Sequence, residues 1–167
     1  MTETNLEAKL AECIATRESR AEDWDTLAFQ AEKAGEELRR AQIRYIGSGG
    51  TGDHRQDDKI LQADHFTFSN MKLPPGAIGP EHNHHDAEEV FFVLEGQLEI
   101  TIHDIQDGTR TASRVLGYRD LAKIPPGVPR SLKNVGKEDA LFCVVLGSPQ
   151  PQLPTYPSTS LVAGVTR

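Results

Sequence analysis

Two histidines and a glutamate stand close together in the chain, in a pattern that could hold a metal ion. His82 and His84 are separated by one residue, so on an extended strand their imidazoles leave the same face, roughly 6–7 Å apart along the backbone. A carboxylate follows at Glu88 or Glu89. Two imidazoles and one carboxylate that converge from paired strands are suited to a divalent metal.

The elements that would position these residues are short strands, which begin at about residue 60. Glycines and prolines separate the candidate strands, which cover residues 88–95, 97–104, 112–117, 120–124, 128–134 and 140–147. The first two flank Gly96 and are typical of a hairpin. About seven short strands at this spacing predict an all-β sandwich or jelly-roll barrel.

The strand over 88–95 is apolar on both faces. Val90 and Phe92 share one face, whereas Phe91 shares the other with Glu89. Because a barrel covers only one face of a strand, the second face needs another cover. We expect this cover to come from a second copy of the chain, in a homodimer, with a contribution from helices near the N-terminus.

Residues 1–46 predict an N-terminal α-helical extension. Leu6, Leu10 and Ile14 recur at intervals of four residues, which is helical spacing. We expect a second helix to end near Tyr45. The extension carries no chemical motif, and a regulatory, oligomerising or lid function stays open.

Two segments that flank the predicted barrel have loop-like compositions. Residues 47–63 are a glycine-rich connector, and they lack the Lys-Ser/Thr ending of a phosphate-binding loop, so we favour a flexible loop. The barrel itself is expected over residues 64–148. Residues 149–167 contain four prolines by Pro157 and predict an extended tail over the surface or over a neighbouring subunit.

The composition limits the classes of function. The chain has 167 residues, of which 26% are charged and 37% hydrophobic, which favours one globular domain. A net charge of -7 disfavours a nucleic-acid partner, because phosphate binding needs a basic surface. No secretory signal or membrane-spanning stretch is visible, and Cys13 and Cys143 are interpreted as buried unpaired thiols. These features predict a cytoplasmic protein without a membrane partner.

The motif around the two histidines resembles the cupin superfamily, and the resemblance covers roughly residues 64–148. The first cupin motif is Gly, five residues, His-x-His, three or four residues, Glu, six residues and Gly, and it matches Gly76, His82, His84, Glu89 and Gly96. The resemblance implies a double-stranded β-helix, which is the cupin form of a jelly-roll barrel. It also implies that Glu89, rather than Glu88, is the third metal ligand, and only one of these neighbours can face the interior.

The second cupin motif departs from the family pattern at its metal ligand. The pattern Pro-x-Gly-x-x-His-x-x-x-Asn is matched by Pro125, Gly127 and Asn134, but Arg130 stands in place of the histidine. A guanidinium stays protonated and has no free lone pair, so Arg130 cannot bind a metal. The four-ligand site that the resemblance implies is therefore incomplete.

Two outcomes follow from this replacement. In the first, His82, His84 and Glu89 form a three-ligand site for Fe(II), Mn(II), Ni(II) or Zn(II), and Arg130 binds the carboxylate or enolate of a substrate beside the open positions. In the second, Arg130 forms a buried ion pair with Glu89, repels a divalent cation and leaves the pocket without a metal. The residues alone leave both open.

The resemblance implies a broad set of functions rather than one. We expect a metal-dependent enzyme that acts on a small oxygenated organic acid or diketone, in the manner of a dioxygenase, an isomerase or a lyase. The alternative is a non-catalytic cupin binding module for a small anionic ligand. Either function implies a small-molecule anion as the partner.

Other candidate residues are assigned structural positions. His85 and His103 are expected to point outward, away from the predicted site. The side chains expected in the core or in the pocket wall are Met71, Leu73, Phe91, Leu132 and Phe142.

Overall fold

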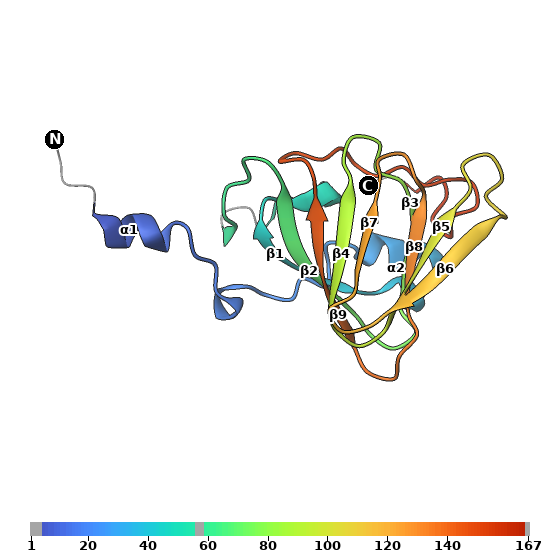
Figure 1. Ribbon diagram of the computed structural model, residues 1–167, viewed down its shortest axis with the longest axis horizontal. Helices are drawn as coiled ribbons and strands as arrows, with labels where there is room; N and C mark the ends of the chain where they lie inside the picture. Colours follow the sequence, from blue (N-terminus) through green and yellow to red (C-terminus); the bar gives the residue numbers. More distant parts are fainter. Residues whose placement is uncertain (1–4, 56–58, 166–167) are drawn as a thin grey trace.

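The computed structural model describes residues 5–55 and 59–165. Parts of the predicted extension (1–4), connector (56–58) and tail (166–167) lie outside the described residues. In the described part of the chain, nine strands form two antiparallel sheets that face each other (Figure 1). The predicted all-β jelly-roll barrel is confirmed.

The strand order brings segments that are distant in sequence into contact. The first sheet runs in the order β1 (Ala41–Ile46), β2 (Thr67–Leu73), β9 (Ala140–Leu146), β4 (Glu89–Glu95) and β7 (Leu121–Ile124). The second runs in the order β3 (Ile78–His82), β8 (Arg130–Asn134), β5 (Leu98–His103) and β6 (Thr111–Leu116). The bounds of β4 to β9 differ from the six strands predicted over residues 88–147 by at most two residues.

The inward faces of both sheets form the main hydrophobic core. Phe91 and Phe142 meet edge to face, with ring centroids 6.1 Å apart, and Leu73 and Leu98 are fully buried. All five side chains expected in the core are buried. The β4–β5 turn requires glycine, because Gly96 has a φ of 77° and a Cβ atom there would lie 2.6 Å from a backbone oxygen.

The prediction that a helix ends near Tyr45 is wrong. The described extension contains two short helices, α1 (Leu6–Ala11) and α2 (Ala28–Ala34), and the 3-10 turns η1 (Arg17–Ser19) and η2 (Glu36–Leu38). Residues 41–46 instead form β1, which pairs antiparallel with β2. Ile43 is buried and lies opposite Asn70 in this pairing, so the segment satisfies its backbone hydrogen bonds as an edge strand of the barrel.

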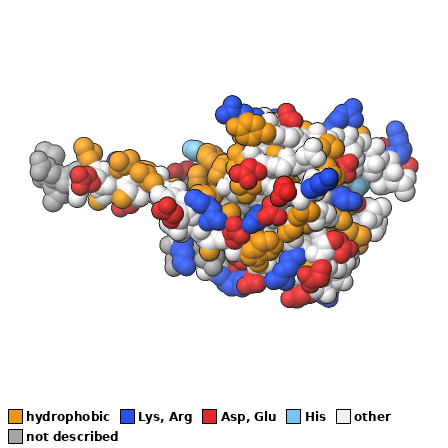
Figure 2. Space-filling model, turned by 90° about the horizontal axis from the view of Figure 1, so that it is seen from below, with side chains coloured by type: hydrophobic (Ala, Val, Ile, Leu, Met, Phe, Trp, Pro, Cys, Tyr) orange, Lys and Arg blue, Asp and Glu red, His pale blue; other side chains and the backbone are white. Residues whose placement is uncertain are grey.

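The first helix does not cover the barrel. It projects away from the body of the molecule (Figures 1 and 2), and its apolar residues Leu6 and Leu10 are 76% and 60% exposed, as is 52% of Ile14 just after it. On the outer face of β4, Val90 and Phe92 are half-buried. The homodimer expected to cover that face stays a prediction. None of the described helices combines the length and the apolar character that crossing a membrane requires.

The connector and the tail both pack on the barrel rather than extending into solvent. The connector contains the 3-10 turn η3 (Gly49–Thr51) and the buried side chain of Asp53. In the tail, the backbone of Thr155 exchanges two hydrogen bonds with Asn83, at 2.9 and 3.0 Å. Val162 is fully buried in a second apolar cluster with Ala31 of α2 and Leu38 of η2. Both cysteines are free, and Cys13 is exposed rather than buried.

Candidate metal centre

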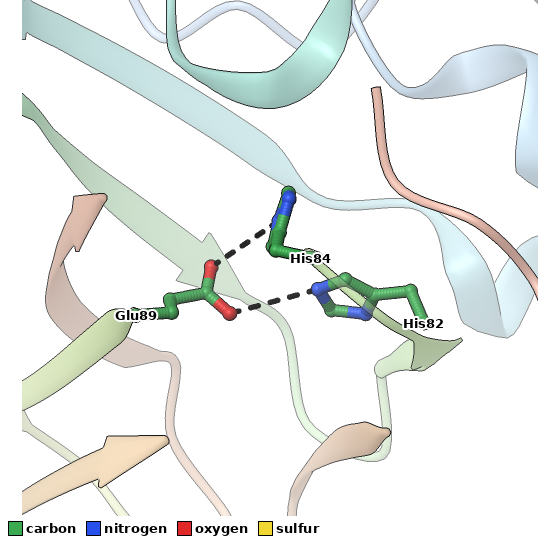
Figure 3. Close-up of side chains that lie close together, drawn as sticks. All are labelled: His82, His84 and Glu89. Atoms are coloured by element: carbon green, nitrogen blue, oxygen red, sulfur yellow. Dashed lines mark ion pairs between the residues drawn. The ribbon is translucent and has the colours of Figure 1, made fainter. Parts of the chain in front are cut away.

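The three predicted ligand side chains converge inside the barrel. His82 lies at the end of β3, His84 follows it, and Glu89 begins β4. One ligand atom of each residue lies within 4.8 Å of the other two. Figure 3 shows the Glu89 carboxylate facing both imidazoles, with its Oε2 3.7 Å from His82 Nε2 and its Oε1 4.0 Å from His84 Nε2. Glu88 lies on the opposite face and forms an ion pair with Lys123 at 2.8 Å.

The His82 ring is oriented for metal binding by a backbone carbonyl. Its Nδ1 lies 2.8 Å from the Pro80 oxygen, which can only accept, so Nδ1 carries the proton. Its Nε2 then faces the Glu89 carboxylate. The 3.7 Å between His82 Nε2 and Glu89 Oε2 is longer than a hydrogen bond, and a metal ion bound by both side chains would lie between these two atoms.

His84 is buried without a hydrogen-bond partner in the described part of the protein. Its Nδ1 is unpaired, and the 4.0 Å from Nε2 to Glu89 exceeds hydrogen-bond length. Burial lowers the pKa of His84 to about 4, against the opposing influence of the Glu89 charge, so the ring is neutral at neutral pH. Gly50 packs against this ring, since a Cβ atom at Gly50 would lie 2.7 Å from His84 Cε1. The predicted flexible connector therefore helps to hold a candidate ligand.

Glu89 is ionised and is shared between the histidines and Arg130. Burial acts to raise its pKa, but His82, Arg130 and His84 together outweigh that effect and lower it to about 2. Arg130 donates from Nε and Nη2 to Glu89 Oε2, at 2.8 and 2.6 Å. Only Oε1, on the side of His84, is left without a donor from Arg130. The donor set therefore consists of two imidazoles, one of them neutral, and a carboxylate, which fits a divalent first-row metal.

The role expected of Arg130 is revised by its position. Its side chain is completely buried, and it is absent from the residues that line the central cavity. Two of its donor nitrogens are engaged by Glu89, and a third contacts the Val128 carbonyl at 3.3 Å. Of the two predicted arrangements, the geometry contains the ion pair with Glu89, and it does not support direct contact between Arg130 and a substrate anion.

The three candidate ligands open into a central cavity of about 510 Å³. Met71, Phe91 and Leu132 contribute apolar walls from the barrel, as expected. Another part of the wall comes from outside the predicted barrel and includes Leu27, Phe29, Gln30, Arg40, Gln42, Leu153 and Tyr156. None of these residues was expected in the pocket wall. Neither His85 nor His103 lines this cavity, as expected: His85 is exposed, and His103 lies 3.0 Å from Ser131.

Comparison with known proteins agrees with this architecture. The family model for the Cupin domain matches residues 69–146. The chain contains a cupin domain. The matched region extends from within β2 to the end of β9, so it includes the three candidate ligands and Arg130 but excludes α2, β1 and the tail.

The relatives of this cupin are larger proteins. Germin-like protein 1-2 of Oryza sativa subsp. japonica is 33% identical over 98 residues, which are 59% of this chain and 42% of that protein. Oxalate oxidase 1 of Hordeum vulgare is 30% identical over 94 residues, or 56% and 47% of the two chains. A solved oxalate oxidase structure superposes with a TM-score of 0.62 at 20% identity, covering 92% of this chain and 68% of that one. The chain thus spans about half the length of the curated relatives it matches, and the structural likeness shows the fold.

The protonation states at the site predict that the metal-free cupin loses stability in acid. His84 has a pKa of about 4 in the folded state and about 6.5 when unfolded, so between these values the unfolded chain binds more protons. Stability therefore falls as the pH falls through this window, by on the order of 3 kcal/mol for His84 alone. The depressed pKa of Glu89 extends the loss from about pH 4.5 towards about pH 2.

Denaturant unfolding of chelator-treated protein, measured from about pH 7 to about pH 4, tests this expectation. His84→Asn should flatten the decline between about pH 6.5 and pH 4, because the residue that titrates differently in the two states is gone. His85→Asn is the matched control, since that neighbouring imidazole is exposed. An unaltered slope in folded His84→Asn protein would contradict the expectation.

Proposed function

We propose that this protein is a metal-dependent cupin that acts on a small oxygenated organic acid or diketone, with dioxygenase-like or isomerase/lyase-like chemistry. His82, His84 and Glu89 would hold one divalent ion, of Fe(II), Mn(II), Ni(II) or Zn(II). When bound, such an ion supplies a Lewis acid that polarises a carbonyl or carboxylate oxygen. A three-residue donor set leaves positions on the ion open to ligands from the cavity.

The observation that carries the proposal is the convergence of His82, His84 and Glu89, whose candidate ligand atoms all lie within 4.8 Å of one another. The Pro80 carbonyl orients the His82 ring so that its Nε2 is directed at the ionised carboxylate of Glu89. Burial keeps His84 beside them in its neutral form. Glu89 Oε1 receives no donor from Arg130, so a metal ion could bind this oxygen together with the two imidazoles. The match to oxalate oxidase supports an organic acid as the substrate class.

The second candidate function is a non-catalytic cupin binding module for a small anionic ligand. The ion pair between Arg130 and Glu89 favours it, because a fixed cation stands where the family pattern has a fourth metal ligand. In this function the two histidines and the cavity walls would recognise the anion without a bound metal.

Metal analysis of protein purified without chelator separates the two functions. We expect about one equivalent of Mn(II), Fe(II), Ni(II) or Zn(II) after equilibrium dialysis, and loss of that equivalent in the His82→Ala/His84→Ala double variant. His85→Ala is the control, because this neighbouring histidine is exposed and is not among the candidate ligands. Less than about a tenth of an equivalent after metal addition contradicts the enzyme function.

Turnover is measured on the metal-loaded protein. Oxygen uptake and substrate loss with oxalate, glycolate, larger 2-hydroxy acids and a 1,3-diketone would support the enzyme function. Saturable binding of an acid with neither oxygen uptake nor substrate loss across this series would support the binding module.

A further inference from the structure

One wall of the central cavity is built by segments that lie outside the matched cupin domain. The helix α2 contributes Gln30, the segment into β1 contributes Arg40, and the tail contributes Tyr156. The same cavity is lined by His82, His84 and Glu89. A ligand that fills the cavity therefore contacts both the candidate metal centre and this added wall.

Arg40 differs from the other two buried arginines in its partners. Arg130 is paired with Glu89 at 2.6 Å, and Arg44 is paired with Asp23 at 3.1 Å. Arg40 donates only to neutral acceptors, the Leu38 carbonyl at 2.8 Å and Gln30 Oε1 at 2.6 Å. Among the described residues, no carboxylate forms an ion pair with it within 4.0 Å.

A buried cation without an anionic partner is costly to the fold, so its presence in a cavity wall points to a ligand. Burial lowers the pKa of Arg40 to about 10, against the opposing influence of Tyr156, and the guanidinium stays charged at neutral pH. Gln30 holds the guanidinium through its Oε1, and its own Nε2 donates to the Tyr156 hydroxyl at 2.8 Å. The cation is thereby fixed in position before any ligand arrives.

We propose that Arg40 binds the carboxylate of an organic acid that has an apolar body, and that this acid is the ligand class of the cavity. This inference rests on the proposed function only in assigning the other end of the ligand to the candidate metal centre. The apolar lining from Leu27, Phe29 and Met71 favours an aromatic or branched aliphatic body. The cavity of about 510 Å³ is in the range that holds drug-sized ligands and is far larger than a two-carbon acid requires.

Binding to chelator-treated full-length protein tests Arg40 without any contribution from a metal. Benzoate and its neutral isostere benzamide are titrated by calorimetry at about pH 7. We expect benzoate to bind at least about tenfold more tightly, because a charge-assisted contact with a buried guanidinium distinguishes the two probes. Glycolate should bind at least about tenfold more weakly than benzoate, because it lacks the apolar body.

Gln30→Glu is the decisive variant. It places a carboxylate beside Arg40 with almost no change in shape, so it neutralises the cation while adding an ion pair to the fold. The benzoate preference should fall to less than about threefold in this variant and in Arg40→Met. Gln97→Glu adds the same charge at the exposed β4–β5 turn and should leave the preference unchanged.

Three outcomes overturn the inference: equal binding of benzoate and benzamide by the wild-type protein, a preference that persists in folded Gln30→Glu, or glycolate binding as tight as benzoate binding. None of these depends on metal binding. If the anion preference holds while the protein takes up no metal, the proposed enzyme function fails alone. If metal binds but the preference is absent, only the role of Arg40 fails.

Discussion

Replacing Glu89 by alanine is expected to lower the free energy of unfolding of the metal-free protein by about 3–5 kcal/mol and to abolish metal binding. The carboxylate accepts two hydrogen bonds from the completely buried Arg130. Without it, that guanidinium would remain charged in the interior with no anionic partner, which is the costly way to break a buried ion pair. Denaturant unfolding and equilibrium dialysis with Zn(II) measure the two effects.

Glu88→Ala is the matched control for this experiment. The neighbouring glutamate pairs with Lys123 on the outside of β4, and both side chains are about half exposed. Such a surface pair contributes about 0–1 kcal/mol, and Glu88 is not a candidate ligand. A change in Glu89→Ala no larger than the change in Glu88→Ala would contradict the inward position of Glu89 and its pairing with Arg130.

Arg130→His is expected to tighten metal binding at least about tenfold, because repulsion between charges 4 Å apart inside a protein is on the order of 4 kcal/mol. The substitution removes a fixed cation from Glu89 Oε2 and supplies an imidazole at the position that the family pattern reserves for a ligand. The same variant should be less stable without metal, since Glu89 loses its buried partner. Competition against a chromophoric chelator measures the affinity for Zn(II) and Mn(II).

Arg114→His, on the exposed surface of β6, controls for the extra histidine. Circular dichroism and thermal unfolding with saturating Zn(II) establish that Arg130→His protein is folded when its affinity is measured. Equal or weaker metal binding by the folded variant would show that Arg130 does not limit the affinity of the site.

The candidate metal centre was predictable because its geometry is local. His82 and His84 share a face through the period of two in an extended chain, and the same rule allowed only one of Glu88 and Glu89 to point inward. The ion pair between Arg130 and Glu89 was one of two arrangements that the residues left open. Choosing between them depends on how β4 and β8 are brought together, in different sheets, which the residue pattern alone does not specify.

The cavity wall formed by α2, the segment into β1 and the tail was not predicted. The positions of these segments depend on contacts between residues distant in sequence, and not on a local residue pattern. Arg40, Gln42 and Arg44 alternate with apolar residues, a period of two that favours a strand, but neighbouring helical spacing led to the prediction of a helix near Tyr45. The partner of β1 is β2, which begins 21 residues after β1 ends and across the glycine-rich connector. The closeness of Gln30 and Arg40 follows only from that pairing and from the packing of α2.

The backbone bridge between Asn83 and Thr155 ties the tail to the residue that separates the two histidines. Gly50, in the connector, packs against the ring of His84. Residues 82–84 are thus held between the connector and the tail, two segments that lie outside the matched cupin domain. A fragment of residues 69–146 would keep every candidate ligand but would lose the contacts that Gly50 and Thr155 make with residues 82–84. In this protein, the matched cupin domain supplies the candidate metal ligands, and the connector and the tail restrict the movement of the two histidines.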